Sequence, residues 1–100
     1  MIIYSIHIKI PKNIIRNWEN WMQKTHIPDV MKTGMFLNFK FNQSENIQEQ
    51  EALYIIQYTS SNISKYLNYK TIFAIQLQNQ HNNKFKNQFS AKRELFIKIR

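Results

Sequence analysis

The chain has no cysteine, which excludes disulfide bonds, thiolate metal sites and catalysis by a thiol. It has a single glycine, Gly34, and so it cannot contain a glycine-rich loop that cradles nucleotide phosphates. No apolar run approaches the roughly 20 residues of a membrane-spanning helix. The N-terminal residues lack the basic start and unbroken apolar stretch of a signal peptide. We therefore expect a cytoplasmic protein that does not enter a membrane.

Acidic residues are scarce: six Asp and Glu stand against 14 Lys and Arg, which gives a formal net charge of +8. Such a charge suggests nucleic-acid binding. However, the chain is dominated by Ile, Asn, Lys, Phe and Tyr and is poor in Gly, Ala, Arg and Pro, a composition that AT-rich coding produces. The basic residues are mostly Lys and are spread along the chain, whereas phosphate-reading surfaces favour clustered Arg. We therefore expect no nucleic-acid partner, and a selected basic surface is the alternative.

The chain has the length of one domain with its own core, and we expect a single domain over residues 1–100. Alternating apolar residues predict strands, and apolar residues at helical spacing predict helices. The expected order is a strand over 1–10, a helix from 14 that breaks at 25–28, a short helix ended by Gly34, strands over 35–42 and 52–59, a helix over 63–77, and a strand over 89–99. Residues 43–50 and 78–87 are expected to be polar connectors.

The helical segments carry recognisable start and stop signals. A proline disfavours the helical conformation in the residue before it, so Pro28 predicts the break at 25–28 and the first turn of a new helix. Asp29 would favour the positive end of that helix, and Gly34 would end it. In the last helix, one stripe is expected to face the sheet: Ile63, Tyr66, Leu67, Lys70, Ala74 and Leu77.

The β-α-β-β-α-β order predicts an α+β, ferredoxin-like fold, in which four antiparallel strands form one sheet and two helices cover one of its faces. Two helices cannot cover both faces, yet the strand over 52–59 is apolar on both. Its two faces carry Leu53 and Ile55 on one side and Tyr54, Ile56 and Tyr58 on the other. An exposed apolar face is typical of an interaction surface. We therefore expect a homodimer that packs sheet on sheet, a dimeric α/β barrel.

One segment resembles a known family. It contains Trp18-x-x-Trp21-Met22, then His26-Ile27-Pro28-Asp29-Val30, then Thr33-Gly34-x-Phe36. This pattern resembles a family of uncharacterised bacterial proteins of about 100 residues, a domain of unknown function similar to the dimeric α/β-barrel, ferredoxin-like superfamily. Weaker matches extend over the rest of the chain: Met1-Ile2-Ile3-Tyr4, Tyr66-Leu67, Phe89 and Arg93. The resemblance implies a ferredoxin-like protomer that dimerises through its sheet. The wider superfamily includes cofactor-independent monooxygenases, haem-degrading enzymes, muconolactone isomerases and stress-responsive barrel proteins.

His26 is the first candidate for a functional side chain, because it lies at the expected helix break, where it can point between helix and sheet. There it could act as a general base, anchor a ligand or bind a metal or haem. The alternative is that its ring only bonds the backbone at the Pro28 turn. Asp29 could orient His26 or contribute to ligand binding, or it could simply favour the helix N-terminus.

Three further side chains complete the expected site. Trp18 and Trp21 lie three residues apart on one helix and could line an aromatic pocket for a small planar ligand, or merely fill the core. Arg93 alternates in phase with apolar residues of the last strand, where a buried cation needs a partner. It could be catalytic, bind a ligand carboxylate, pair with Asp29 or Glu19, or reach water at the strand edge.

The other titratable residues form no recognisable motif. We expect His7 to face the dimer partner or solvent, and His81 to be solvated in the polar connector. Three histidines and six acids so scattered lack metal-ligand spacing, and no nucleophile motif is present. We therefore expect no metal and no cofactor.

Three functions stay open at this point. The first is a small dimeric barrel protein with a small-molecule pocket between helices and sheet. The second is a cofactor-independent monooxygenase or isomerase that acts on a small planar substrate with His26 or Arg93. The third is a structural or interaction module, and whether the protein is an enzyme is left undecided.

Overall fold

The computed structural model describes residues 1–45, 50–86 and 88–100. Its strands are β1 (Ile2–Pro11), β2 (Asn38–Gln43), β3 (Glu51–Ser60) and β4 (Ser90–Ile97). A short turn η1 (Lys12–Ile14) leads into the first helix, which consists of α1 (Ile15–Trp21), η2 (Met22–His26) and α2 (Ile27–Lys32). The second helix consists of α3 (Ile63–Asn68), η3 (Tyr69–Phe73) and α4 (Ala74–Lys84).

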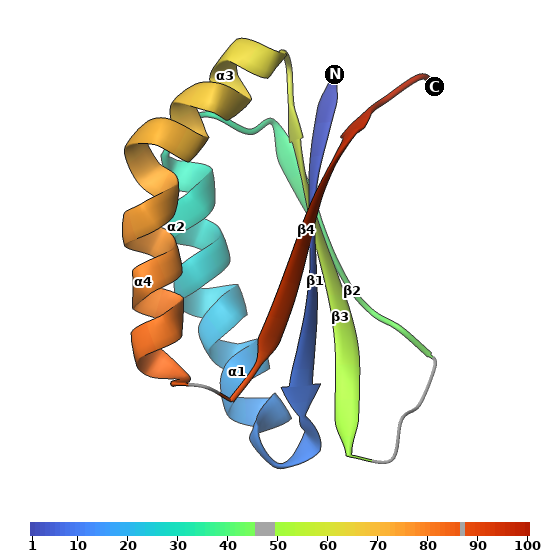
Figure 1. Cartoon of the computed structure of the whole chain (residues 1–100), viewed down its shortest axis with the longest axis vertical. Helices are drawn as coiled ribbons and strands as arrows, with labels where there is room; N and C mark the ends of the chain where they lie inside the picture. Colours follow the sequence, from blue (N-terminus) through green and yellow to red (C-terminus); the bar gives the residue numbers. More distant parts are fainter. Residues whose placement is uncertain (46–49, 87) are drawn as a thin grey trace.

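The strands form one antiparallel sheet in the order β2-β3-β1-β4. Both helices lie on the same face of this sheet, and in the part of the chain described here no helix covers the other face (Figure 1). The two terminal strands β1 and β4 are neighbours, so the N- and C-terminal ends of the sheet lie close together (Figure 1). The expected ferredoxin-like α+β fold is confirmed.

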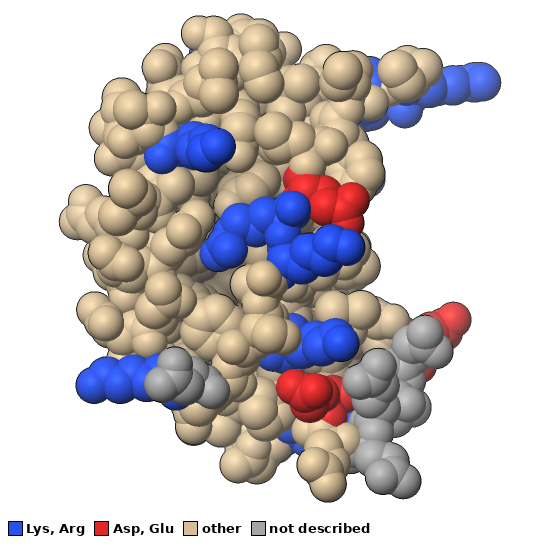
Figure 2. Space-filling model, in the orientation of Figure 1, with Lys and Arg blue, Asp and Glu red and all other residues tan. Residues whose placement is uncertain are grey.

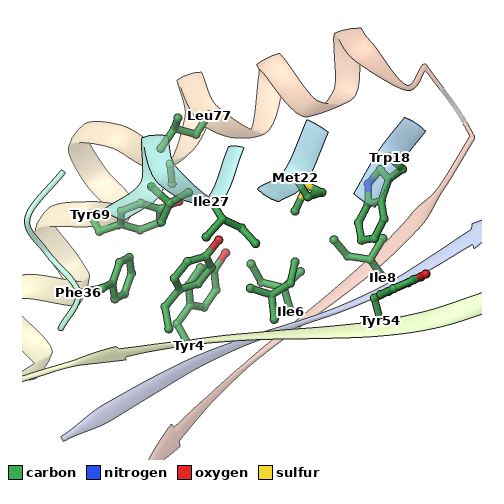
Figure 3. Packing of buried hydrophobic residues seen from close by; sticks show 14 of the residues in the cluster. Tyr4, Ile6, Ile8, Trp18, Met22, Ile27, Phe36, Tyr54, Tyr69 and Leu77 are labelled. Carbon is green, nitrogen blue, oxygen red and sulfur yellow. The ribbon is translucent and has the colours of Figure 1, made fainter. Parts of the chain in front are cut away.

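The core lies between the helices and the sheet. The residues of β1 that were expected on one face, from Tyr4 to Ile10, point to the helices and are buried. From β3 the buried aromatic residues are Tyr54 and Tyr58, which flank Ile56. Aromatic rings fill much of this layer, and Figure 3 shows Trp18 standing over Ile8 and Tyr54 while the Tyr4 ring rises from the sheet. Each aromatic ring buries a large apolar area, so these rings fill a core that contains few small residues.

The first helix does not break at residues 25–28, contrary to the expectation. The segment η2 forms one π-helical turn, in which the Ile27 amide donates to the carbonyl oxygen of Met22, five residues earlier. A proline inside a regular α-helix clashes with the carbonyl four residues before it. The wider turn accommodates Pro28, so the helix continues to Lys32. It ends at Gly34, whose φ of 76° is favourable for glycine alone, and this stop is confirmed.

The second helix is longer than expected, because residues 78–84 of the expected connector are helical. It contains a second π-turn, η3, in which the Ala74 amide donates to the carbonyl oxygen of Tyr69. The π-turn makes the step from Tyr69 to Ala74 in the buried stripe five residues long. The stripe consists of Tyr66, Tyr69, Ala74, Leu77 and His81. The expected stripe was wrong at Ile63, Leu67 and Lys70, which are exposed, because a regular helical period ignores the extra residue of the π-turn.

The strand boundaries differ little from those expected. The strand β2 begins at Asn38 instead of residue 35, because the turn at Gly34 occupies the residues between. Residues 46–49 of the expected loop 43–50 and residue 87 of the expected connector lie outside the described residues. Asn62 caps the second helix, since its Oδ1 accepts from the Lys65 amide at 2.9 Å.

Candidate functional site

A cavity of about 30 Å³ lies between the helices and the sheet, bounded by β1, β3 and β4 on one side and by both helices on the other. A water molecule needs roughly 10–15 Å³ on this scale, so the cavity holds one or two oxygen-sized groups. The sheet contributes three polar side chains to its wall: Tyr4, Tyr58 and Arg93. The helices contribute five: His26, Tyr69, Gln78, His81 and Asn82.

His26 is the last residue of the π-turn η2, and its side chain lines this cavity. Single π-turns are rare in helices and occur frequently at functional sites. The His26 ring stacks on Trp21, with ring centroids 5.3 Å apart, and the residue is only 9% exposed. Burial lowers the pKa of His26 to about 4; the Asp29 carboxylate opposes this shift and the Arg93 charge adds to it. The imidazole is therefore neutral at pH 7.

His81 lies beside His26, with ring centroids 5.5 Å apart, and enters the cavity wall from α4. The indole Nε1–H of Trp18 donates to His81 Nε2 at 2.9 Å. In the neutral ring the proton is therefore on Nδ1. Burial lowers the pKa of His81 to about 3, and the charges of protonated His26 and of Arg93 add to this shift. The expectation of a solvated His81 was wrong.

Two polar atoms of the wall have no partner. Among the buried side-chain atoms of the described residues, His26 Nδ1 and the Tyr58 hydroxyl make no hydrogen bond within the protein. Tyr58 is fully buried, and burial, together with the neighbouring Tyr69 and Tyr4 hydroxyls, raises its pKa. An unpaired buried polar group costs about 1–3 kcal/mol, so it calls for an explanation.

Arg93 lies on the edge strand β4, where its neighbour on β1 is Ile6. Its Nε–H donates to the Tyr4 hydroxyl at 3.1 Å. Arg93 lines the cavity and is also exposed to solvent, so it marks the mouth of the cavity. Figure 2 shows basic side chains at the middle of this face, beside a hollow in the surface.

The structure places the five expected site residues at different depths. His26 and Arg93 line the cavity. Trp18 and Trp21 lie behind it: Trp18 bonds His81, and Trp21 packs against His26 and His81. Asp29 is half-buried in the first turn of α2, and it acts on His26 through its charge.

Sequence reasoning missed His81, Tyr58 and Tyr4 as members of the wall. A signal for His81 was present, because it follows Ala74 and Leu77 at spacings of seven and four residues, which continue the buried helical stripe. The two tyrosines had been assigned to apolar faces of their strands. The structure confirms that assignment. The face of the strand alone, however, does not tell what surrounds the hydroxyl group at the far end of each ring.

The family model of a domain of unknown function, DUF4286, matches residues 1–99. The chain belongs to this family. The resemblance drawn from the Trp18–Phe36 segment is thereby confirmed. A comparison with curated proteins gives no match for this DUF4286 protein. In the described residues, no helix combines the length and apolar character that crossing a membrane would require.

Solved structures share the fold of this DUF4286 protein at low sequence identity. Two are dimeric ferredoxin-like proteins from an uncultured marine organism. One has a TM-score of 0.76 and 12% identity over 99% of this chain and 96% of its own. The other has a TM-score of 0.67 and 13% identity over 100% and 96%. A third is SnoaB, a cofactor-independent oxygenase from Streptomyces nogalater, with a TM-score of 0.65 and 8% identity over 99% and 94%. Likeness at this identity establishes the fold.

Proposed function

We propose that this DUF4286 protein binds a small molecule in the cavity between its helices and its sheet. The observation that carries the proposal is the pair of unpaired buried atoms, His26 Nδ1 and the Tyr58 hydroxyl, on side chains that line one cavity. Both groups cost stability as they stand. A ligand oxygen that bonds them would recover this cost, which is a physical reason for retaining them.

The size of the cavity limits what can enter it. About 30 Å³ admits one or two oxygen-sized groups. The remainder of a ligand would extend to the surface past Arg93 and Asn82, which line the cavity and are exposed. A compact molecule with a polar end therefore suits the cavity better than a large planar ring system.

We propose in addition that the protein is a homodimer that packs through the open face of its sheet. That face carries half-buried Ile3, Leu53 and Ile55 and the exposed Phe96 among polar residues. The two ferredoxin-like neighbours are dimeric, which supports a homodimer, and the apolar residues of the open face favour it as the interface. The expected cytoplasmic location belongs to the same proposal, and fractionation of cells tests it.

The dimer is tested by one substitution on each side of the molecule. Ile55→Lys places a charge at the centre of the open face and should convert the dimer to a monomer in analytical ultracentrifugation. Ile72→Lys changes a residue that is 65% exposed on the helical side and should leave the dimer intact. A wild-type protein that sediments as a monomer at micromolar concentration would contradict this part of the proposal.

A catalytic role is the second candidate. It is favoured by the unpaired Nδ1 of His26 in the cavity and by the fold shared with a cofactor-independent oxygenase. A general base works best when its pKa lies near the working pH. The His26 pKa of about 4 makes the ring a weak base, and for this reason we rank binding before proton abstraction.

Binding is tested first by native mass spectrometry of the purified protein, which detects a retained ligand as extra mass. The second measurement is NMR titration with acetate, glycolate, acetamide and phenol, observed at the His26 and His81 rings. We expect at least one probe to shift these signals in a saturable way. Bare protein in the first experiment and no saturable shift in the second would contradict the proposal.

Two matched variants show whether the cavity is the place of binding. Tyr58→Phe removes an unpaired hydroxyl from the wall and should weaken the binding of any probe that shifts His26. Tyr54→Phe is the control, because the Tyr54 hydroxyl donates to Glu19 outside this cavity. Equal weakening by both variants would assign the effect to general loosening of the core.

A further inference from the structure

The charge of the cavity indicates what kind of ligand it takes. Among the described residues that line it, Arg93 is the only side chain charged at neutral pH, and Asp and Glu are absent from the wall. The adjacent carboxylate on β4, Glu94, points to the opposite face of the sheet, where it pairs with Lys92 at 3.7 Å. Asp29 acts on His26 through its charge but does not line the cavity. Among the described residues, the lining of the cavity thus carries one charge, the positive charge of Arg93.

Arg93 is held in a position suited to a carboxylate. Its Nε–H is engaged by the Tyr4 hydroxyl at 3.1 Å, which is its one hydrogen-bond partner in the part of the chain that the structure describes. The two Nη atoms carry four further N–H donors in one plane. This fork matches the two oxygens of a carboxylate and gives strong, charge-assisted hydrogen bonds.

The interior of the cavity offers a second, uncharged site of recognition. Tyr58 can donate and accept a hydrogen bond, and neutral His26 presents Nδ1. A hydroxyl or carbonyl oxygen in the cavity can bond at least one of them, whereas a methyl group cannot. A volume of about 30 Å³ leaves room for such an oxygen but not for a phosphate group.

We propose that the ligand of this cavity is a small monocarboxylate with a second oxygen, a hydroxyl or carbonyl group, next to the acid. Its carboxylate binds the Arg93 fork at the mouth, and its second oxygen enters the cavity to meet Tyr58 and His26. The inference rests on the proposed function, since it names the ligand class of the same site. A cationic ligand would find no counter-charge in this wall.

The test compares four small molecules at constant ionic strength and pH 7: glycolate, pyruvate, acetate and glycolamide. Acetate lacks the second oxygen and glycolamide lacks the charge. Dissociation constants are measured by NMR titration at the His26 and His81 rings. We expect glycolate or pyruvate to bind at least fivefold more tightly than either acetate or glycolamide.

Variants of Arg93 connect the charge preference to one side chain. Arg93→Gln should weaken the binding of the acids about tenfold or more, as expected for the loss of a charge-assisted hydrogen bond, and should leave glycolamide unchanged. Arg93→Lys keeps the positive charge but lacks the planar guanidinium. Its affinity for the acids should therefore lie between those of the wild-type protein and Arg93→Gln. Arg16→Gln, which removes an exposed arginine of α1, is the control and should have no effect. Thermal unfolding of each variant verifies that it is folded.

The outcomes separate this inference from the proposed function. If glycolamide binds as tightly as glycolate, or if Arg93→Gln binds the acids normally, the anionic ligand is refuted and the cavity stays a binding site. If acetate equals glycolate, the role of the second oxygen is refuted. If none of the four molecules shifts the two rings, the inference fails, and retained mass in native mass spectrometry then decides whether the proposed function fails with it.

Discussion

The two histidines of the cavity have ring centroids 5.5 Å apart and are both buried, but their surroundings differ. Around His81 the polar groups are matched, because the Trp18 indole donates to Nε2 at 2.9 Å. The Phe89 ring packs perpendicular to the His81 ring, with ring centroids 4.1 Å apart. Around His26, Nδ1 and the nearby Tyr58 hydroxyl are left without partners.

This difference distinguishes a structural from a functional polar group. A matched pair such as Trp18 and His81 ties the two helices together and adds to stability. An unmatched buried group lowers stability, and a partner from outside the chain would recover that cost. The contrast can be measured, because each member can be replaced separately.

The largest expected effect is the response of both histidines to acid. Each has a folded-state pKa below the ordinary value of 6.5, about 4 for His26 and about 3 for His81. Below pH 6.5 the unfolded chain therefore binds more protons than the folded one, and the free energy of unfolding falls as pH falls. By pH 4 the loss should be roughly 3 kcal/mol for each histidine.

Urea unfolding at pH 7, 5.5 and 4.5 measures this loss. In the His26→Leu variant only His81 contributes to the loss of stability in acid. Its free energy of unfolding should therefore fall less steeply than that of the wild-type protein as pH is lowered. Equal stability of the wild-type protein at pH 7 and 4.5 would show that neither ring is buried in its neutral form.

The matched pair is broken by Trp18→Phe. This variant removes the indole donor, leaves His81 Nε2 without a partner and opens a small void in a fully buried position. We expect a loss of about 2–3 kcal/mol in urea unfolding at pH 7. Trp21→Phe is the control on the same helix, since Trp21 is half-buried and contacts the two histidines by ring packing. It should cost less than about 1 kcal/mol. Similar losses for both would mean that ring size, and not the hydrogen bond, supports His81.

The smallest expected effect is on the free energy of unfolding, which should change in opposite directions when two tyrosines of β3 are replaced. Tyr58→Phe removes an unpaired hydroxyl and should raise the free energy of unfolding by about 0.5–1 kcal/mol without ligand. Tyr54→Phe removes a hydroxyl that donates to Glu19 and should lower it by about 1–2 kcal/mol. Thermal and urea unfolding of the two variants give the comparison directly. A destabilised Tyr58→Phe would show that its hydroxyl is satisfied in solution, for instance by water.

Much of the fold could be predicted from the sequence, because the strands alternate cleanly and Gly34 marks a stop. The position of His26 placed it between helix and sheet, whereas the alternation of β4 put Arg93 in phase with apolar residues and left its role open. The π-turns could not be predicted, since a single extra residue leaves no mark in a periodic pattern, and for that reason the stripe through Leu67 and Lys70 was wrong. The lack of a partner for Tyr58 could not be predicted either, because it depends on the surroundings of one oxygen atom.

The π-turns also mean that each helix is one residue longer than its contact with the sheet requires. In the first helix the core residues Met22 and Ile27 are five apart across the wide turn, and Tyr69 and Ala74 repeat this spacing in the second. A regular α-helical turn of four residues would bring both ends of either helix to the same face. Removing one residue from η2 should therefore preserve the packing at both ends while it changes how His26 meets the cavity. Insertion and deletion, and not only substitution, can remodel this site.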